Sequence, residues 1–110
     1  MTELQENSGA ATTAKLTGKQ ARYLRGLGHG LKPVVQIGKH GVGESVESQV
    51  EECLLAHELI KVKVLETSPL GRDEVASRLV SSNGVAVAQK LGRTLLLYRP
   101  HPDHPAIELP

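Results

Sequence analysis

The sequence contains one cysteine, Cys53, and no apolar run that approaches the roughly 18 residues needed to span a bilayer. A single cysteine excludes an internal disulfide and is typical of a reducing compartment, so we expect a cytoplasmic location. The polar N-terminal stretch "MTELQENSGAATTA" lacks the apolar segment of a signal peptide. These absences together argue against a role at a membrane.

Aromatic residues are almost missing as well. Phenylalanine and tryptophan do not occur, and the two tyrosines are Tyr23 and Tyr98. Proteins that hold single-stranded nucleic acid often stack its bases on aromatic rings. A stacking surface of that kind is nearly unavailable here, so any nucleic acid would have to be held mainly by its backbone.

Charges of one sign are grouped along the chain, although the net charge is only +1. Residues 15–43 carry only basic charges, at Lys15, Lys19, Arg22, Arg25, Lys32 and Lys39. An acidic block follows, at Glu44, Glu47, Glu51, Glu52 and Glu58, and Lys61 and Lys63 then begin a second basic region. Such blocks affect association more than fold, and they predict a molecule with two electrically different faces.

The length of 110 residues indicates one domain. Residues 1–14 are small and polar without periodicity, and we expect this N-terminal extension to be disordered. Residues 15–100 are expected to form the folded domain. The proline-punctuated residues 101–110 are expected to run as an extended tail along its surface.

A helix is predicted from Thr17 to about Gly28, because Thr17 and Gln20 have the spacing of a capping box. Its apolar stripe is expected to consist of Leu16, Leu24 and Leu27. Basic residues recur at every third position on another flank, at Lys19, Arg22 and Arg25. A solvated helix face is the ordinary interpretation of such a flank, and a binding surface is the alternative.

The remaining elements alternate between strands and helices. Strands are predicted at Val34–Ile37, in "LIKVKVLE" and in the hairpin of "VAVAQK" and "TLLLYR", and helices at about 43–57 and 69–84. The order helix then βαβαββ predicts an α/β (α+β) fold of two layers, in which the second and third helices cover one face of a mixed four-stranded sheet. The continuous apolar run "TLLLY" suits a central strand, which favours the strand order 1-2-4-3.

The stretch "GKHGVGES" (38–45) carries the most information about function. It lacks the lysine of a nucleotide-binding P-loop, whose place is taken by Glu44, so an NTPase is disfavoured. Gly38–Gly41 nevertheless forms a G-x-x-G turn at a helix start, where backbone N–H groups can approach a phosphate. The turn is similar to the clamp by which KH domains hold a nucleic-acid backbone. A simple tight turn is the alternative, and we expect the loop on the surface, where Gly41→Asp would leave the core intact.

Three stretches, "TGKQARYLRGLGHGLKPVVQIGKHG", "AHELIKVKV" and "GRTLLLYRP", together resemble the CRM domain (chloroplast RNA splicing and ribosome maturation), especially its short bacterial, YhbY-like members. The resemblance covers about residues 15–100. It implies a two-layer fold similar to the C-terminal domain of a bacterial translation initiation factor, and binding to RNA, particularly precursors of the large ribosomal subunit. Carried over by position, the glycine-rich loop is Gly38, Lys39, His40 and Gly41, with Lys32, Lys61 and Lys63 as neighbouring basic positions.

We therefore expect a non-enzymatic RNA-binding protein that assists assembly of the large ribosomal subunit. Its partners would be ribosomal RNA precursors and, as a further possibility, ribosomal proteins. The expected RNA surface consists of the loop, the neighbouring lysines and the helical residues Lys19, Arg22 and Arg25. The alternative is a protein-binding adaptor that uses the acidic second helix as its contact surface.

Other reactive side chains carry less weight. Cys53 and His57 lie four apart on one predicted helix, and His101 and His104 have ligand-like spacing in the tail, but neither pair has an evident third ligand. No serine nucleophile motif or pair of catalytic carboxylates stands out. We therefore expect no catalytic site, no metal and no cofactor.

Overall fold

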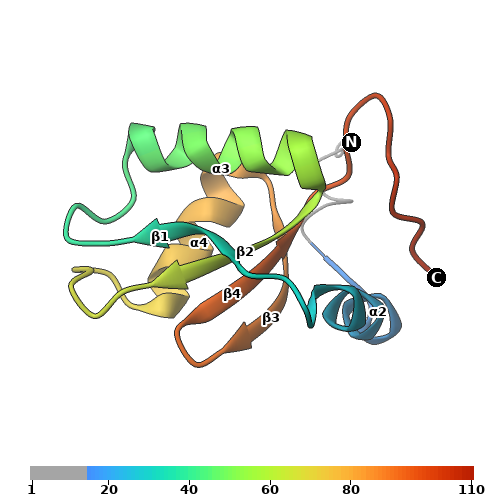
Figure 1. Ribbon diagram of the computed structural model, residues 1–110, viewed down its shortest axis with the longest axis horizontal. Helices are drawn as coiled ribbons and strands as arrows, with labels where there is room; N and C mark the ends of the chain where they lie inside the picture. Colours follow the sequence, from blue (N-terminus) through green and yellow to red (C-terminus); the bar gives the residue numbers. More distant parts are fainter. Residues whose placement is uncertain (1–14) are drawn as a thin grey trace, which may run out of the picture.

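The computed structural model describes residues 15–110, so the N-terminal extension over residues 1–14 lies outside the described residues. The described chain forms three helices and four strands, and the strands make up one sheet (Figure 1). The helices are α2 (Gly18–Gly28), α3 (Glu44–His57) and α4 (Arg72–Asn83), and the strands are β1 (Pro33–Ile37), β2 (Leu59–Val64), β3 (Ala86–Leu91) and β4 (Thr94–Tyr98). None of these helices is both long and apolar enough to cross a membrane.

The sheet has the strand order β1-β2-β4-β3, which confirms the order predicted from the sequence. β1 and β2 run parallel, whereas β4 runs antiparallel to β2 and β3. β4 contributes to the cores on both faces of the sheet, with Leu95 and Leu97 on one side and Leu96 and Tyr98 on the other. Because both of its faces are covered, this strand has a continuous apolar sequence.

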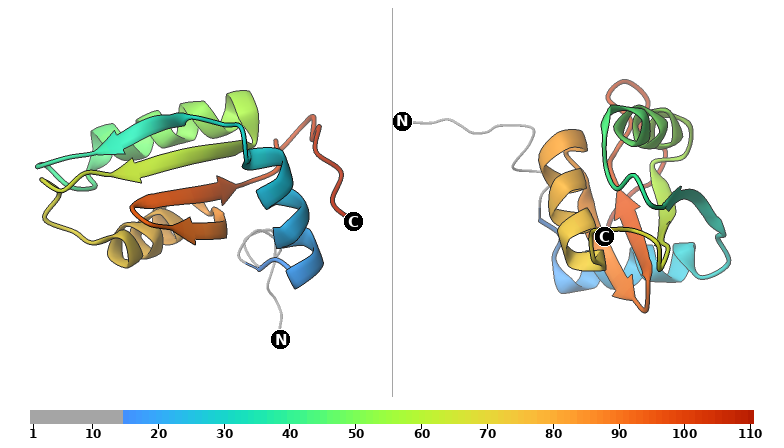
Figure 2. Two further views of the ribbon diagram at one scale, coloured as in Figure 1. Left: turned by 60° about the horizontal axis from the view of Figure 1, so that its bottom comes forward. Right: turned by 90° about the vertical axis from the view of Figure 1, so that its left-hand side faces the viewer.

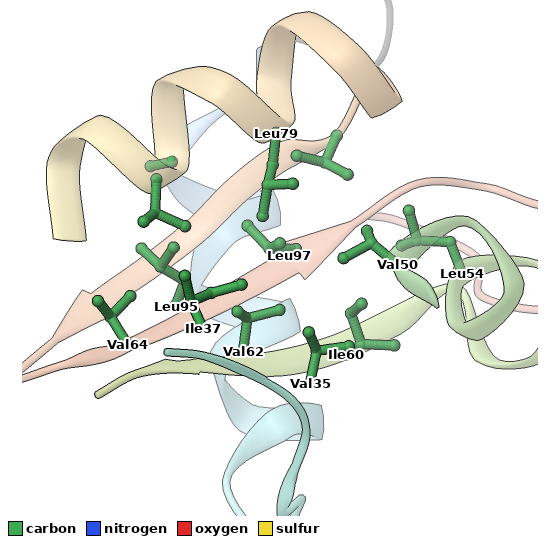
Figure 3. Close-up of a cluster of buried hydrophobic side chains, with 13 residues drawn as sticks. Val35, Ile37, Val50, Leu54, Ile60, Val62, Val64, Leu79, Leu95 and Leu97 are labelled. Carbon is green, nitrogen blue, oxygen red and sulfur yellow. The ribbon is translucent and has the colours of Figure 1, made fainter. Parts of the chain in front are cut away.

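The larger core lies between the sheet and helices α3 and α4, which cover the same face as predicted (Figure 3). Apolar residues at helical spacing point down from the helices, and alternate strand residues point up to meet them. Thirteen buried residues form this core: Val50 and Leu54 of α3, Val75, Ala76 and Leu79 of α4, and Val35, Ile37, Ile60, Val62, Val64, Val85, Leu95 and Leu97 of the sheet and its margin.

Helix α2 packs on the opposite face of the sheet, a position that the sequence pattern did not predict (Figure 2). The smaller core beneath it consists of five buried residues: Leu24, Leu59, Ala88, Leu96 and Tyr98. Gly28 allows α2 to approach closely, since a Cβ at this position would lie 2.7 Å from Leu96 Cδ1. Leu27, predicted to belong to the apolar stripe, is instead 45% exposed, because Leu24 and Gly28 share the buried side one helical turn apart.

Local capping sets the ends of the helices. The predicted capping box of α2 is present: Gln20 N–H donates to Thr17 Oγ1 and Thr17 N–H donates to Gln20 Oε1, each at 3.1 Å. α4 ends as predicted at Gly84, which adopts the left-handed conformation at φ +66°. α4 begins at Arg72, later than predicted, because the hydroxyl of Ser68 closes a turn with the backbone of Leu70.

Glu58 fixes the C-terminal tail to the domain. This residue follows α3, adopts φ +60° and is buried. Its carboxylate accepts backbone hydrogen bonds from His101 at 2.6 Å, Ala106 at 3.0 Å and Ile107 at 2.9 Å. The tail therefore curls around one carboxylate before it continues.

The rest of the tail runs beside α2 (Figures 1 and 2). Ile107 and Leu109 are half-buried against the smaller core, and Gln20 Nε2 donates to the carbonyl oxygen of Pro110 at 3.3 Å. The apolar residues of the tail extend the smaller core.

Candidate functional site

The glycine loop Gly38–Gly41 follows β1, precedes the start of α3 and forms a tight turn. The N–H of Gly41 donates to the carbonyl oxygen of Gly38 at 3.0 Å, and Lys39 and His40 are exposed at the tip of the turn. The loop lies at the same end of the sheet as the loop between β2 and α4, because β1 and β2 are parallel (Figure 1). The side chains able to meet a ligand here are thus those of Lys39 and His40.

Gly41 itself is buried, which corrects the expectation that a side chain at this position would leave the core undisturbed. Its φ of +65° lies in the left-handed region, where residues with a Cβ are strained. A Cβ at Gly41 would also lie 3.4 Å from Pro69 Cγ in the neighbouring loop. A Gly41→Asp substitution would therefore disturb the fold together with any ligand site.

The start of α3 is open but carries acidic side chains. Gly43 is its N-cap, with extended backbone at φ −130° and open space around a Cβ built on it. Glu44 and Glu47 lie in the first turn, where their negative charges stabilise the positive end of the helix dipole. The negative charges of these glutamates would repel an anion from the helix end. An anion near the loop would therefore be held mainly by the loop backbone and Lys39.

The lysines of β2 lie on the face of the sheet opposite the larger core, as predicted. Lys63 is exposed and pairs in register with Gln36 of β1 and Thr94 of β4. Lys61 is half-buried, and its Nζ donates to the carbonyl oxygen of His29 at 3.5 Å, just after α2. Lys63 therefore lies toward the glycine-loop end of the sheet, and Lys61 lies toward α2.

The basic residues of α2 lie at the end of the sheet away from the glycine loop (Figure 1). Lys19 and Arg22 are exposed and Arg25 is half-buried, while Lys32 is exposed between α2 and β1. The structure does not bring these α2 residues to the loop. The predicted site is thus an elongated basic surface: the loop at one end, Lys63 and Lys61 in the middle, and Lys32 with the α2 residues at the other end.

The acidic residues of α3 have partly structural roles that the sequence did not reveal. Arg99 forms a bidentate ion pair with Glu51, at 2.8 Å and 2.7 Å, and also donates to the carbonyl oxygen of Asn83. The hydrogen bond from Arg99 is the main reason that the pKa of Glu51 lies below its ordinary value. This network ties α3, α4 and the end of β4 together, so Glu51 is not a free acidic contact.

Glu58 is likewise a structural carboxylate. Burial by itself raises its pKa, but the backbone hydrogen bonds from His101, Ile107 and Ala106 outweigh burial and hold the pKa below the ordinary value. The sequence places Glu58 in a run of glutamates with nothing to distinguish it. Its role depends on the tail, more than 40 residues later in the chain.

The pairs Cys53 with His57 and His101 with His104 show the features of packing or surface residues. Cys53 packs against the larger core, and burial raises the pKa of its thiol. His101 and His104 stack with their ring centroids 5.8 Å apart, and His101 Nδ1 accepts the backbone N–H groups of Asp103 and His104. Among residues 15–110, no group of three or more His, Cys, Asp or Glu side chains lies close enough together to hold a metal.

An apolar groove beside α2 was not predicted. It has a volume of about 420 Å³ and lies between α2, β1, the start of β2 and the tail. Leu27, Leu31 and Val34 are exposed along it. One signal was available in the sequence: because Val35 and Ile37 point inward, Val34 had to place an apolar side chain on the open side of β1.

Comparisons with known proteins agree with this architecture. The chain is 42% identical over 95 residues to "Probable RNA-binding protein YqeI" of Bacillus subtilis, covering 86% of this chain and 99% of that one. It is 39% identical to an "RNA-binding protein" of Haemophilus influenzae, with 86% and 95% coverage. The solution structure of the hypothetical protein SAV1595 from Staphylococcus aureus superposes with a TM-score of 0.73 at 40% identity, covering 87% of this chain and all of that one. Residues 16–99 match the model of the CRS1 / YhbY (CRM) domain, and the chain belongs to that family.

Proposed function

We propose that this protein binds RNA along the elongated basic surface, with the glycine loop and the β2 lysines on the phosphate backbone. The observation that carries the proposal is the position of Lys61 and Lys63 on the sheet face opposite α3 and α4, on the strand next to β1, which leads into the loop that carries Lys39. Backbone contacts fit a chain that has no Phe or Trp and in which Tyr23 is exposed but Tyr98 is buried. The relatives named as RNA-binding proteins support this assignment.

The finer proposal is that the RNA is a precursor of the large ribosomal subunit and that the protein assists its assembly in the cytoplasm. This rests on family membership. An adaptor role for the acidic block is less well supported, because two of its five glutamates are engaged within the protein: Glu51 by Arg99 and Glu58 by the tail. Crosslinking the protein to RNA in cells and sequencing the attached fragments tests the assignment, and fragments free of ribosomal RNA precursors would contradict it.

Binding through phosphates predicts a steep salt dependence that specific variants should flatten. Each phosphate contact removed reduces the slope of log affinity against log salt by about 0.7 for single-stranded RNA. We expect Lys39→Ala to remove one such contact and the Lys61→Ala, Lys63→Ala double variant to remove two. The matched control is Arg78→Ala, an exposed positive charge on α4 at the other face of the sheet, which should leave the slope unchanged.

Gly43→Asp tests the glycine-loop end of the basic surface. Unlike a substitution at Gly41, it should not disturb the fold. The extended backbone and open surroundings of Gly43 accept a side chain, and aspartate at an N-cap is more stable than glycine by a few tenths of a kcal/mol. Its carboxylate would repel a phosphate held by the adjacent loop. We expect weaker RNA binding together with an unchanged or slightly higher melting temperature. If Gly43→Asp, Lys39→Ala and the double lysine variant all bind RNA like Arg78→Ala, the basic surface is not the binding site.

A further inference from the structure

The groove beside α2 is lined mainly by apolar side chains. Leu27, Leu31, Val34 and Ile107 form the walls, and Leu59 lies at the floor. The volume of about 420 Å³ lies within the range of about 300–1,000 Å³ found for small-molecule sites. Leu27, Leu31 and Val34 are exposed, so these walls are open to solvent in the free protein.

The charges at the groove are of one sign. Lys32 and Lys61 lie at its margin together with His57, and no carboxylate is among the described residues that line it. Lys61 also belongs to the row of basic residues that leads along β2 to Lys63 and the glycine loop. A suitable ligand would place an apolar group inside the groove and negative charges beside Lys32 and Lys61.

We propose that this groove receives one unstacked nucleobase of the bound RNA, with the adjoining phosphates facing Lys32 and Lys61. The inference rests on the proposed function and adds a base-binding position to a surface otherwise made of backbone contacts. Aliphatic side chains take the place of the aromatic rings that usually hold an unstacked base. An apolar protein side chain would gain nothing from the two lysines, whereas a nucleotide uses both the apolar walls and the positive margin.

The groove is pre-formed because the tail is fixed in place. Ile107, one of its walls, donates its backbone N–H to the buried carboxylate of Glu58 at 2.9 Å. β1 separates the groove from the glycine loop by about 13 Å, the rise of four residues in a strand. A single strand of RNA must therefore extend over several nucleotides to reach both positions, and shorter oligonucleotides should bind one of them only.

The test uses the full chain and two matched variants that change no charge. Leu27→Gln removes an apolar wall, and Leu55→Gln is the control, because the two leucines are 45% and 42% exposed and each lies in the last turn of its helix. The probe is a single-stranded RNA dodecamer with one central adenine replaced by 2-aminopurine, whose fluorescence rises when it leaves the base stack. A second dodecamer of the same backbone is abasic at every position.

With the first dodecamer, we expect Leu27→Gln to weaken binding about five- to tenfold, corresponding to the lower end of base-stacking energies, and to remove the rise in fluorescence. Leu55→Gln should bind like the wild type. With the abasic dodecamer, the wild type and Leu27→Gln should bind equally well, because the wall then has no base to contact.

Two outcomes would overturn the proposal, and they are distinguishable. A wild-type protein that shows no salt-dependent binding to either dodecamer contradicts both the proposed function and the groove. Salt-dependent binding by the wild type, with Leu27→Gln and Leu55→Gln equal on both probes, contradicts the groove alone. The apolar walls would then be assigned to contact with a protein segment.

Discussion

The two faces of the sheet are covered in different ways. On one face, α3 and α4 cover a core of thirteen buried residues. The ion pair of Glu51 with Arg99 joins α3 to the end of β4. On the other face, one short helix and an irregular tail cover five buried residues and leave Lys61, Lys63 and a groove at the surface. The larger core can therefore hold the fold, and under the proposed function the other face carries the binding surface.

The largest expected effect tests whether the first face holds the fold. Leu79→Ala removes a fully buried side chain from the larger core and should cost about 2–5 kcal/mol of unfolding free energy. Leu24→Ala makes the same change in the smaller core and should fall at the low end of that range, because α2 can readjust or detach. Chemical denaturation measures both, and equal losses would show that α2 is as essential to the fold as α4.

A smaller effect is expected where the tail joins the second face. Glu58→Gln keeps the size of the side chain but removes the charge that holds the backbone N–H groups of His101, Ala106 and Ile107. Loss of one such charge-assisted hydrogen bond costs about 1.5–3 kcal/mol. We expect faster amide exchange at Ala106 and Ile107, with α3 and α4 unaffected. Unchanged exchange would mean that packing of Ile107 and Leu109 alone fixes the tail.

The same anchor predicts a pH dependence. The pKa of Glu58 is lowered in the folded state from its ordinary value of 4.5. Its contribution to stability is therefore complete above about that pH and is lost as the pH falls through the lower, folded-state pKa. Relative to the intrinsic exchange rate at each pH, tail amides should lose protection below pH 4.5 in the wild type, whereas Glu58→Gln should show little change in protection with pH at those positions.

The smallest expected effect tests how closely the second face is packed. Gly28→Ala would place a Cβ 2.7 Å from Leu96 Cδ1, and such overpacking costs about 1–3 kcal/mol, partly offset by about 0.5–1 kcal/mol for replacing a helical glycine. Gly26→Ala is the control, because open space surrounds that position on the same helix, and it should stabilise the protein. If both variants are stabilised, α2 moves freely enough to accommodate the methyl group.

The fold could be predicted in large part because its signals are local. Thr17 and Gln20 mark the start of α2, Gly84 marks the end of α4, and the apolar run of β4 indicates a strand buried on both faces. The face occupied by α2 could not be predicted in this way, because it depends on the fit of Gly28 against Leu96, which lies in a distant strand. The anchored tail depends in the same manner on Glu58, whose neighbours in the sequence give no sign of its role.

The candidate site was predictable by residue type but not by arrangement. Alternation along β2 placed Lys61 and Lys63 together on the face away from the larger core, and the structure confirms that placement. The separation of the α2 residues from the glycine loop follows from where α2 packs, which only the tertiary structure reveals. The burial of Gly41 was hidden for a similar reason, because its contact is Pro69 in the neighbouring loop. Whether these residues bind RNA stays a prediction.

The central position of β4 has a consequence for biosynthesis. Because Leu95 and Leu97 complete one core while Leu96 and Tyr98 complete the other, neither core can close until the ribosome has delivered residues up to Tyr98. β2 can pair with the earlier strand β1, but its pairing with β4 must wait for residues about 35 positions later in the chain, a long-range pairing of the kind that slows folding. A nascent chain stalled before β4 would expose both apolar layers at once and would be prone to aggregate or to require a chaperone.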